Sequence, residues 1–335
     1  MYSFLRPLLF SLDPETAHQL TLQLLRVAGN VPLSNWLLTQ LYQIKSTPVQ
    51  VFGLTFKNPI GLAAGYDKDG IAIRGLAALG FGHIEVGTVT PEPQAGNPRP
   101  RVFRLLEDEA VINRMGFPSQ GMSQVADRMS KVGDRRSVIV GVNLGKNKDT
   151  PLEDAARDYI ALMKVFAPLA DYLTINISSP NTVGLRRLQG REMLDNLLRQ
   201  INMERGTWNL KRPILVKISP DLSDEELDDA IGVIIDKKMD GIIATNTTLS
   251  REGVRFKLEG ETGGLSGSPL KVRSEAVLSQ VVKHVNGKIP IVSVGGIMTP
   301  DDAKKRLALG ASLVQVYTGL IYRGPGLVKQ ILKNL

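Results

Sequence analysis

Residues 172–181 read YLTINISSPN, an apolar run with β-branched residues that ends abruptly in small hydroxyl and amide side chains. Such a run is typical of a strand that is buried on both faces, as in a parallel sheet. From about residue 50 onward the pattern occurs eight times, in NPIGLAA (58–64), HIEVGT (83–88), VIVGVN (138–143), YLTINI (172–177), PILVKI (213–218), GIIATN (241–246), PIVSVG (290–295) and SLVQVY (312–317). The sequence therefore predicts eight strands, each followed by a polar turn.

Segments with helical periodicity follow these runs. They cover residues 70–80, 119–131, 152–167, 191–204, 223–238, 270–285, 300–309 and 325–334. Eight strand-then-helix units predict a (β/α)8 TIM barrel, which we expect to occupy residues 48–335. A Rossmann-like open sheet is the alternative, but the GxGxxG motif is missing after the first strand.

Composition limits the chemistry that is available. The 335 residues include no cysteine, so disulfides, cysteine metal sites and thiolate catalysis are excluded. The three histidines, His18, His83 and His284, form no metal-binding motif, and we expect no metal. The net charge of +8 comes without a stripe of basic residues interleaved with aromatic ones, so we expect no nucleic-acid partner.

Residues 1–47 precede the first barrel strand and predict a small helical extension. Asp13 is suited to cap a helix that begins at Pro14. One face of this helix is apolar, with Ala17, Leu20, Leu24 and Val27. The opening MYSFLRPLLFSL is too short to span a bilayer. Periodicity alone favours helices that pack on the barrel over helices that lie at a membrane surface.

The active site of a TIM barrel lies at the C-terminal ends of its strands. Here these ends are polar or glycine-rich, in AAGYDKDG, GTVT, NLGKNKD, NISSPN, KISPD, TNTT, VGGI and YTG. Glycines in VGGI (294–297), in the expected loop GGLSG (263–267) and in YTG (317–319) suit a phosphate group bound by backbone N–H groups. Turn geometry explains each of them singly about as well, but together they predict a phosphorylated ligand.

Lys217 lies inside an apolar strand, where a buried cation must be paired or used. Three roles are open for it: a Schiff-base lysine, a cation beside an electron-rich ring, or the partner of a core carboxylate.

Amide side chains gather at four strand ends, at Asn143, Asn176, Asn181 and Asn246. They offer donors and acceptors to a flat polar heterocycle. Lys68 and Asn113 add a cation and an amide that suit a small carboxylate.

These motifs resemble those of dihydroorotate dehydrogenases over nearly the whole chain and in the order of that family. They are GLAAGYDKDG (61–70), IEVGTVTP (84–91), INRMGFPSQG (112–121), NLGKNKDTP (143–151), NISSPNTVGLR (176–186), ATNTT (244–248), GGLSG, SVGGI and LVQVYTGLIYRGPG (313–326). The quinone-dependent class 2 is the more similar one, because it has serine where class 1 has cysteine and because it has an N-terminal helical extension.

The resemblance implies one FMN across the barrel mouth and dihydroorotate beside it. The residues implied for FMN are Ala64, Gly65, Tyr66, Asp67, Lys68, Thr88, Asn143, Asn176, Lys217, Thr245, Gly267, Gly296, Tyr317 and Thr318. Those implied for dihydroorotate are Lys68, Asn113, Arg114, Met115, Gly116, Phe117, Asn176, Asn181, Asn246 and Thr247. Ser179 resembles the base that takes a proton as dihydroorotate becomes orotate in pyrimidine biosynthesis. Thr182 and water are expected to relay that proton.

The same resemblance implies a membrane quinone as the electron acceptor. His18, Arg104 and Tyr317 match positions of the quinone site in this family. The extension is then expected to form an apolar passage to the flavin. With this resemblance we favour a peripheral protein on the cytoplasmic face of the inner membrane.

Two alternatives use the same residues. One is another FMN-dependent barrel oxidoreductase that acts on a dihydropyrimidine; such enzymes use NAD(P)H or a cysteine acid, which the missing cysteine disfavours. The other is a non-redox phosphate-binding barrel in which Lys217 forms a Schiff base.

Overall fold

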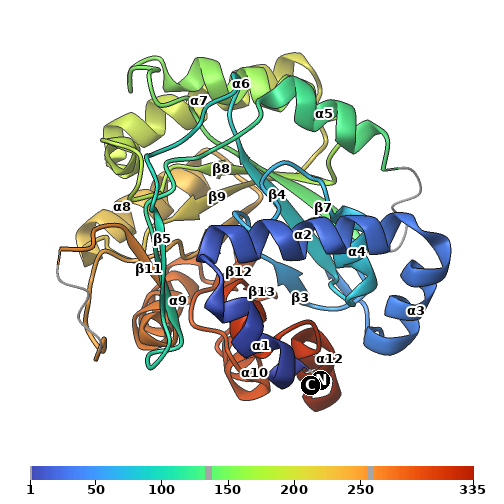
Figure 1. The fold of residues 1–335 in the computed structure, drawn as a ribbon. Helices are drawn as coiled ribbons and strands as arrows, with labels where there is room; N and C mark the ends of the chain where they lie inside the picture. The colour runs from blue at the N-terminus through green and yellow to red at the C-terminus, as the bar shows by residue number, and fades with distance from the viewer. Residues whose placement is uncertain (1, 133–137, 256–259) are drawn as a thin grey trace.

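Eight parallel strands close into a barrel in the computed structural model, which describes residues 2–132, 138–255 and 260–335 (Figure 1). In order around the barrel they are β3 (Ile60–Leu62), β4 (His83–Val89), β7 (Ile139–Leu144), β8 (Tyr172–Asn176), β9 (Ile214–Ile218), β10 (Gly241–Ala244), β12 (Ile291–Val294) and β13 (Leu313–Val316). The last strand, β13, pairs with β3, so the sheet has no free edge. The predicted barrel and its eight strands are confirmed.

Helices surround the strands and bury their outward faces. They are α4 (Ile73–Ala78), α5 (Met122–Ser130), α6 (Ala155–Phe166), α7 (Arg191–Thr207), α8 (Asp224–Asp236), α9 (Lys271–Val285), α10 (Pro300–Ala308), α11 (Thr318–Arg323) and α12 (Leu327–Asn334), with short 3-10 turns at Leu185–Gln189 and Ser268–Leu270. Because both faces of each strand are covered, the strands are apolar along most of their length. All eight predicted helices are present; the short α11 was not predicted.

Among the described residues, five short strands lie outside the barrel, and none of them was predicted. The hairpin of β1 (Val49–Val51) and β2 (Leu54–Phe56) packs Val51 and Phe56 against barrel residues such as Leu215. The other three, β5 (Val102–Leu105), β6 (Ala110–Asn113) and β11 (Gly264–Gly267), form an antiparallel sheet.

The prediction that GGLSG (263–267) is a loop is wrong, because most of it is strand β11. β11 pairs with β6, with Gly264 opposite Asn113. A glycine-rich segment has little intrinsic strand propensity, and here the pairing comes from a strand about 150 residues earlier in the chain.

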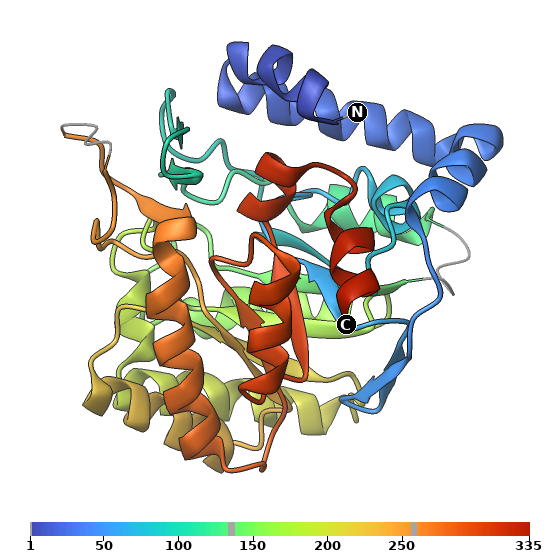
Figure 2. The same ribbon diagram turned by 90° about the horizontal axis from the view of Figure 1, so that it is seen from below.

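The N-terminal residues form three helices, α1 (Tyr2–Ser11), α2 (Pro14–Asn30) and α3 (Pro32–Tyr42). Asp13 caps α2 as predicted, since its carboxylate accepts the backbone N–H groups of Glu15 and Thr16. Figure 2 shows the three helices as a layer of their own at one end of the barrel, with β5 beside it. Within the described part of the chain, no helix is both long enough and apolar enough to cross a bilayer.

The layer is held to the barrel by a backbone contact between α2 and α4. A Cβ atom on Gly75 would lie 2.1 Å from the carbonyl oxygen of Leu25, and one on Gly29 would lie 2.3 Å from the nitrogen of Gly75. Both positions therefore require glycine for the helices to approach this closely.

We expect Gly75→Ala to lower the free energy of unfolding by about 1–3 kcal/mol, the usual range for overpacking. Gly232→Ala in α8 is the matched control, because a Cβ there meets nothing within 4 Å. The control should raise stability by up to about 1 kcal/mol through helix propensity. Thermal unfolding of both variants measures the difference, and equal stability of Gly75→Ala and wild type would contradict the close contact.

Candidate functional site

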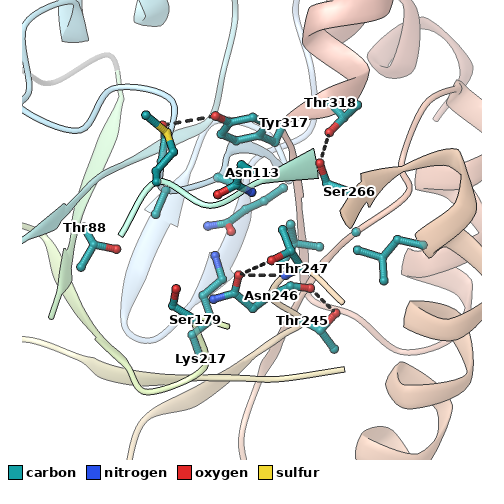
Figure 3. Close-up of a pocket in the computed structure, with 18 of the residues that line it drawn as sticks. Thr88, Asn113, Ser179, Lys217, Thr245, Asn246, Thr247, Ser266, Tyr317 and Thr318 are labelled. Carbon is teal, nitrogen blue, oxygen red and sulfur yellow. Dashed lines mark hydrogen bonds between the residues drawn. The ribbon is translucent and has the colours of Figure 1, made fainter. Parts of the chain in front are cut away.

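A cavity opens at the C-terminal ends of the barrel strands (Figure 3). Residues that end or follow seven of the eight strands line it, and only β7 contributes none. Thr88 and Ser179 lie at one side of the cavity, while Ser266 and Thr318 lie at the other. We call this space the mouth cavity.

Most residues predicted for a cofactor or a substrate line the mouth cavity. They are Ala64, Gly65, Lys68, Thr88, Asn113, Met115, Gly116, Phe117, Asn176, Ser179, Asn181, Lys217, Thr245, Asn246, Thr247, Gly267, Gly296, Tyr317 and Thr318. The structure thus brings together side chains that are up to about 250 residues apart in the chain. Lining residues that the sequence did not single out include Leu270, Met298 and Gln315.

Four of the residues predicted for the cofactor or the substrate do not line the mouth cavity. Two of them, Asp67 and Arg114, instead bind backbone N–H groups or an opposite charge nearby. The carboxylate of Asp67 accepts the N–H groups of Ile71 and Ala72 at 2.9 and 2.8 Å, so it orders the turn before α4. Burial raises the pKa of Asp67 to about 6. The Arg114 guanidinium pairs with Glu261 and does not line the mouth cavity. Both side chains therefore stabilise segments next to the site and do not contact a ligand in the mouth cavity.

The other two are Tyr66 and Asn143, whose side chains contact neighbouring residues instead of lining the mouth cavity. The Tyr66 ring lies edge-on to His18 and to Tyr317, with ring centroids 5.0 and 5.8 Å apart. Asn143 is fully buried, and its side-chain oxygen accepts hydrogen bonds from Thr88 Oγ1 at 2.5 Å and Asn176 Nδ2 at 2.9 Å. Asn143 therefore orients two residues that do line the mouth.

A buried carboxylate, Glu85, lies beneath the mouth inside the barrel. It accepts hydrogen bonds from Asn143 Nδ2 at 2.8 Å, Tyr172 Oη at 3.1 Å and Gln315 Nε2 at 3.0 Å. Neither Glu85 nor Gln315 was predicted from the sequence. Each of them is a polar residue inside an apolar run. The same pattern singled out Lys217, so both residues could have been predicted as functional.

Lys217 is buried, and its amine forms no hydrogen bond or ion pair among the described residues. Burial lowers its pKa, and the negative charge of Glu85 opposes this shift. The side-chain oxygen of Gln315 is also buried without a partner. A free cation and a free acceptor at the floor of one cavity fit a ligand ring that carries both acceptors and donors.

The far side of the mouth cavity has the form of a phosphate cradle. Gly296 has φ +70°, and a Cβ there would lie 2.4 Å from Cα of Lys271, so no side chain fits. The buried Arg306 donates to the carbonyl oxygen of Gly295 at 2.8 Å and holds this loop from behind. Thr318 Oγ1 donates to Ser266 Oγ at 2.8 Å across the cradle.

The opposite side is built around Ser179. Its hydroxyl oxygen accepts the backbone N–H of Asn181 at 3.2 Å, and Asn181 Nδ2 donates to Asn113 Oδ1 at 3.0 Å. The hydroxyl of Thr182 is buried and has no partner among the residues described. An unsatisfied buried hydroxyl near a strand end suits a bound water molecule.

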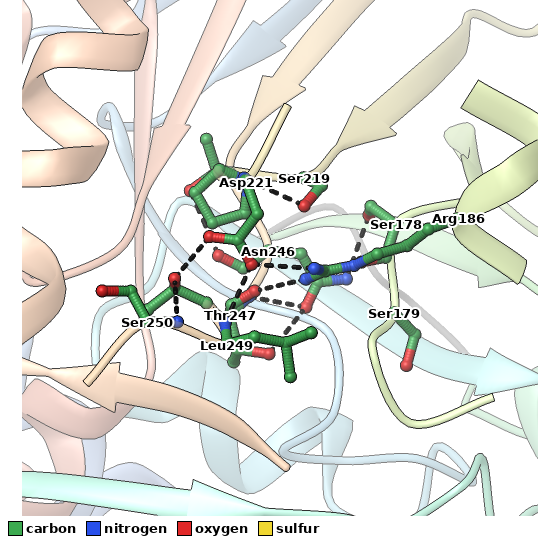
Figure 4. A network of polar contacts seen from close by, with 12 residues as sticks. Ser178, Ser179, Arg186, Ser219, Asp221, Asn246, Thr247, Leu249 and Ser250 are labelled. Carbon is green, nitrogen blue, oxygen red and sulfur yellow. Dashed lines mark hydrogen bonds and ion pairs between the residues drawn. The ribbon is translucent and has the colours of Figure 1, made fainter. Parts of the chain in front are cut away.

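Arg186 ties the loops after β8 and β10 together (Figure 4). Its guanidinium donates to the carbonyl oxygens of Ser178 at 3.0 Å and Thr247 at 2.9 Å, and it pairs with Asp221 at 2.7 Å. The Ser179 hydroxyl points away from this network. Arg186 thus holds the loop that carries Ser179, while the Ser179 side chain lines the mouth cavity and can contact a ligand there.

A second cavity of ≈ 480 Å³ lies between α1, α2 and the barrel. Its apolar lining includes Leu5, Leu8, Leu9, Phe10, Ala17, Leu20, Leu24, Leu25, Leu320 and Ile321. The three residues predicted for a quinone, His18, Arg104 and Tyr317, line this cavity too. We call it the helix cavity.

The two cavities meet at a shared wall, formed by Lys68, Asn113, Met115 and Tyr317, which line both of them. Burial, and then the charge of Lys68, lower the pKa of His18 to about 3, so this imidazole is neutral at physiological pH. An apolar cavity with a neutral imidazole thus abuts a polar one.

A TIM barrel with a glycine-lined cradle, a buried cation and a polar mouth has the form of a barrel enzyme, and its mouth suits a phosphorylated ring ligand. No group of three or more His, Asp or Glu side chains within the described ranges is arranged to hold a metal ion.

Comparison with known proteins identifies the family. The family model described as dihydroorotate dehydrogenase matches residues 46–335. The protein of Roseiflexus sp. (strain RS-1), named dihydroorotate dehydrogenase (quinone), is 49% identical over 337 residues, which cover 100% of this chain and 93% of the relative. The protein of the same name from Azotobacter vinelandii (strain DJ / ATCC BAA-1303) is 47% identical, with 100% and 96% covered.

A solved structure of a named dihydroorotate dehydrogenase has the same fold. The crystal structure of DHODH from Eimeria tenella in complex with ferulenol superposes with a TM-score of 0.89 at 41% identity, covering 98% of this chain and 93% of that chain. The chain belongs to the dihydroorotate dehydrogenase family. The predictions of this family and of its quinone-dependent class are confirmed.

Proposed function

We propose that this enzyme oxidises dihydroorotate to orotate at FMN in the mouth cavity and passes the electrons to a quinone in the helix cavity. The observation that carries this proposal is the shared wall of Lys68, Asn113, Met115 and Tyr317. A ring bound at that wall is within reach of a polar substrate from one side and an apolar acceptor from the other.

The mouth cavity fits FMN. The cradle around Gly267, Gly296 and Thr318 suits its phosphate, and Lys217 with Gln315 suits the polar edge of its ring. When bound, FMN supplies the hydride acceptor and returns the electrons to the quinone. The buried cation of Lys217 stabilises negative charge on a bound ring, which fits the second of the roles open for it.

Amides and a cation hold dihydroorotate. Asn113, Asn181, Asn246 and Thr247 line one region of the mouth, where Asn246 Nδ2 donates to Ser178 Oγ at 3.0 Å. Lys68 closes this region, and burial lowers its pKa to about 8. It is therefore mostly protonated at neutral pH and suits the carboxylate of the substrate.

Ser179 takes the proton from one substrate carbon while the neighbouring carbon gives up its hydride. A serine hydroxyl is a weak base, so it must release its own proton as it accepts one. The unpartnered hydroxyl of Thr182 is suited to hold the water molecule that receives this proton. The backbone N–H of Asn181 keeps the Ser179 oxygen in place.

The helical extension, residues 1–47, serves the quinone, and residues 48–335 form the FMN-binding catalytic domain. Twelve of the eighteen strongly exposed large apolar residues in the described ranges lie on or between α1, α2 and α3. They include Phe4, Val27, Leu33 and Trp36, which are 86%, 61%, 67% and 57% exposed.

An apolar surface of this size favours association with another apolar phase. Val27, predicted on one apolar face with Leu20 and Leu24, is exposed and does not pack on the barrel. We therefore infer a peripheral protein that rests on the cytoplasmic face of the inner membrane through these helices.

The proposed function is tested by mixing the purified protein with dihydroorotate without oxygen or quinone. We expect flavin absorbance that bleaches in the wild type and bleaches at least about 100-fold more slowly in Ser179→Ala, as is usual for loss of a general base. Fast bleaching of Ser179→Ala would show that another group takes the proton. A colourless protein would instead favour a non-redox barrel that uses Lys217.

The charge of Lys68 is expected to make the affinity for orotate depend on pH. Its charge is lost as the pH rises through about 8, so the free enzyme should bind orotate about tenfold more weakly at pH 9 than at pH 7. Isothermal titration measures this affinity. Lys68→Met is the reference, because it should bind weakly at both pH values and lose the difference. A wild type with constant affinity over this range would contradict the role of Lys68.

Membrane association is tested on α3 at residues that line neither cavity. The variant with Leu33→Ser and Trp36→Ser should bind lipid vesicles about tenfold less, because two large apolar side chains no longer enter the bilayer. It should reduce a short-chain, water-soluble quinone at the wild-type rate. Val272→Ser in α9, which is 77% exposed, is the matched control and should leave vesicle sedimentation unchanged. Equal sedimentation of all three proteins would contradict the membrane surface.

A further inference from the structure

A buried ion pair joins the N-terminal layer to the loop before β5. The Glu15 carboxylate in α2 lies 2.7 Å from Arg101 Nη2 through Oε1 and accepts from Arg101 Nε at 3.1 Å through Oε2. The Arg101 and Glu15 side chains are 7% and 9% exposed. The geometry is bidentate, which fixes the relative position of the two groups as well as their separation.

Arg101 passes this contact on to residues 95–97. Its Nη1 donates to the carbonyl oxygens of Ala95 at 2.6 Å and Asn97 at 2.9 Å. The Asn97 amide Nδ2 in turn donates to the carbonyl oxygens of Arg114 at 2.8 Å and Asn181 at 3.3 Å. Asn97 thus connects the two segments that carry the predicted substrate residues.

The final contact reaches the proposed base. The backbone N–H of Asn181 donates to Ser179 Oγ at 3.2 Å, and its side chain holds Asn113. A continuous series of polar contacts therefore runs from Glu15 through Arg101, Asn97 and Asn181 to Ser179. Asn97 lines neither cavity, so it acts only through its neighbours.

We propose that Glu15, Arg101 and Asn97 are positioning residues for the oxidation of dihydroorotate, through which helix α2 holds Asn113 and Asn181 in the geometry that presents the substrate to Ser179. This inference rests on the proposed function. On this proposal the N-terminal layer contributes to both half-reactions. Glu15 positions the substrate residues, and the apolar surface of the helices serves the quinone and the membrane.

The contacts also make the two cavities interdependent. A ligand that fixes α2 from the helix cavity fixes Glu15, and through it the segments around Asn113 and Asn181. By thermodynamic linkage, a ligand that orders those segments must in turn favour the same position of α2.

A simpler role for the ion pair is to anchor α2, and a matched variant separates the two roles. Arg99 also pairs with Glu15 Oε1, at 2.9 Å, but its side chain is 60% exposed, and it is Arg101, not Arg99, that donates to the carbonyl oxygens of Ala95 and Asn97. Arg99→Gln removes a positive charge from the same carboxylate and leaves the series of contacts intact. Asn97→Ala breaks the series and leaves the ion pair intact.

The test uses the FMN-loaded, full-length enzyme and measures orotate affinity by isothermal titration, together with flavin reduction at varied dihydroorotate. We expect Asn97→Ala and Glu15→Gln each to raise the orotate dissociation constant about fivefold or more, the lower end of coupling between sites. The double variant should show less than the product of the two effects, because both break one series. Asn97→Ala should leave the KM for quinone unchanged, and Arg99→Gln should bind orotate like the wild type.

Wild-type orotate affinity in Asn97→Ala and Glu15→Gln, with only a lower unfolding temperature, would overturn the inference and leave the ion pair as an anchor. If Glu15→Gln does not fold, Asn97→Ala and Arg99→Gln still decide between the two roles. Failure of the proposed function is a different result: the wild type itself would neither bind orotate nor be reduced by dihydroorotate.

Discussion

Closure of the eight parallel strands is the constraint on which the rest of this structure depends. Once β13 pairs with β3, every barrel strand has a neighbour on both sides and the barrel sheet has no unpaired backbone edge. Closure also brings the C-terminal ends of all eight strands to one rim. Side chains as distant in the chain as Ala64 and Thr318 therefore line one cavity, and helices can cover the outside without obstructing it.

Inside the barrel, Glu85 supports that rim from below. A buried carboxylate is tolerated only when its oxygens are hydrogen-bonded, and Asn143, Tyr172 and Gln315 provide those donors. The contact with Asn143 also fixes the amide that orients Thr88 and Asn176 at the mouth. The floor of the site is thus polar and hydrogen-bonded, whereas the helix cavity beside it is mostly apolar and lies between α1, α2 and the barrel.

The sequence predicted the barrel and its polar rim, because strand runs and polar strand ends are local signals. Most of the individual residues that line the mouth were predicted through the resemblance to a known family. It did not predict β5, β6 and β11, whose pairing depends on segments far apart in the chain. It also did not predict that Asn143 acts from beneath the surface or that Arg114 turns away to Glu261, because side-chain direction depends on neighbours that only the fold supplies. Glu85 was visible as a charge in an apolar run and was overlooked.

We propose a route in which substrate and quinone reach one flavin from two separate cavities that share the wall of Lys68, Asn113, Met115 and Tyr317. It is tested most directly by reducing the enzyme, removing the pyrimidine, and mixing it without oxygen with a quinone, with and without saturating orotate. Separate cavities predict that flavin absorbance returns whether or not orotate fills the mouth. Competition between orotate and the quinone for the reduced enzyme would contradict the claim, because both would then occupy one cavity.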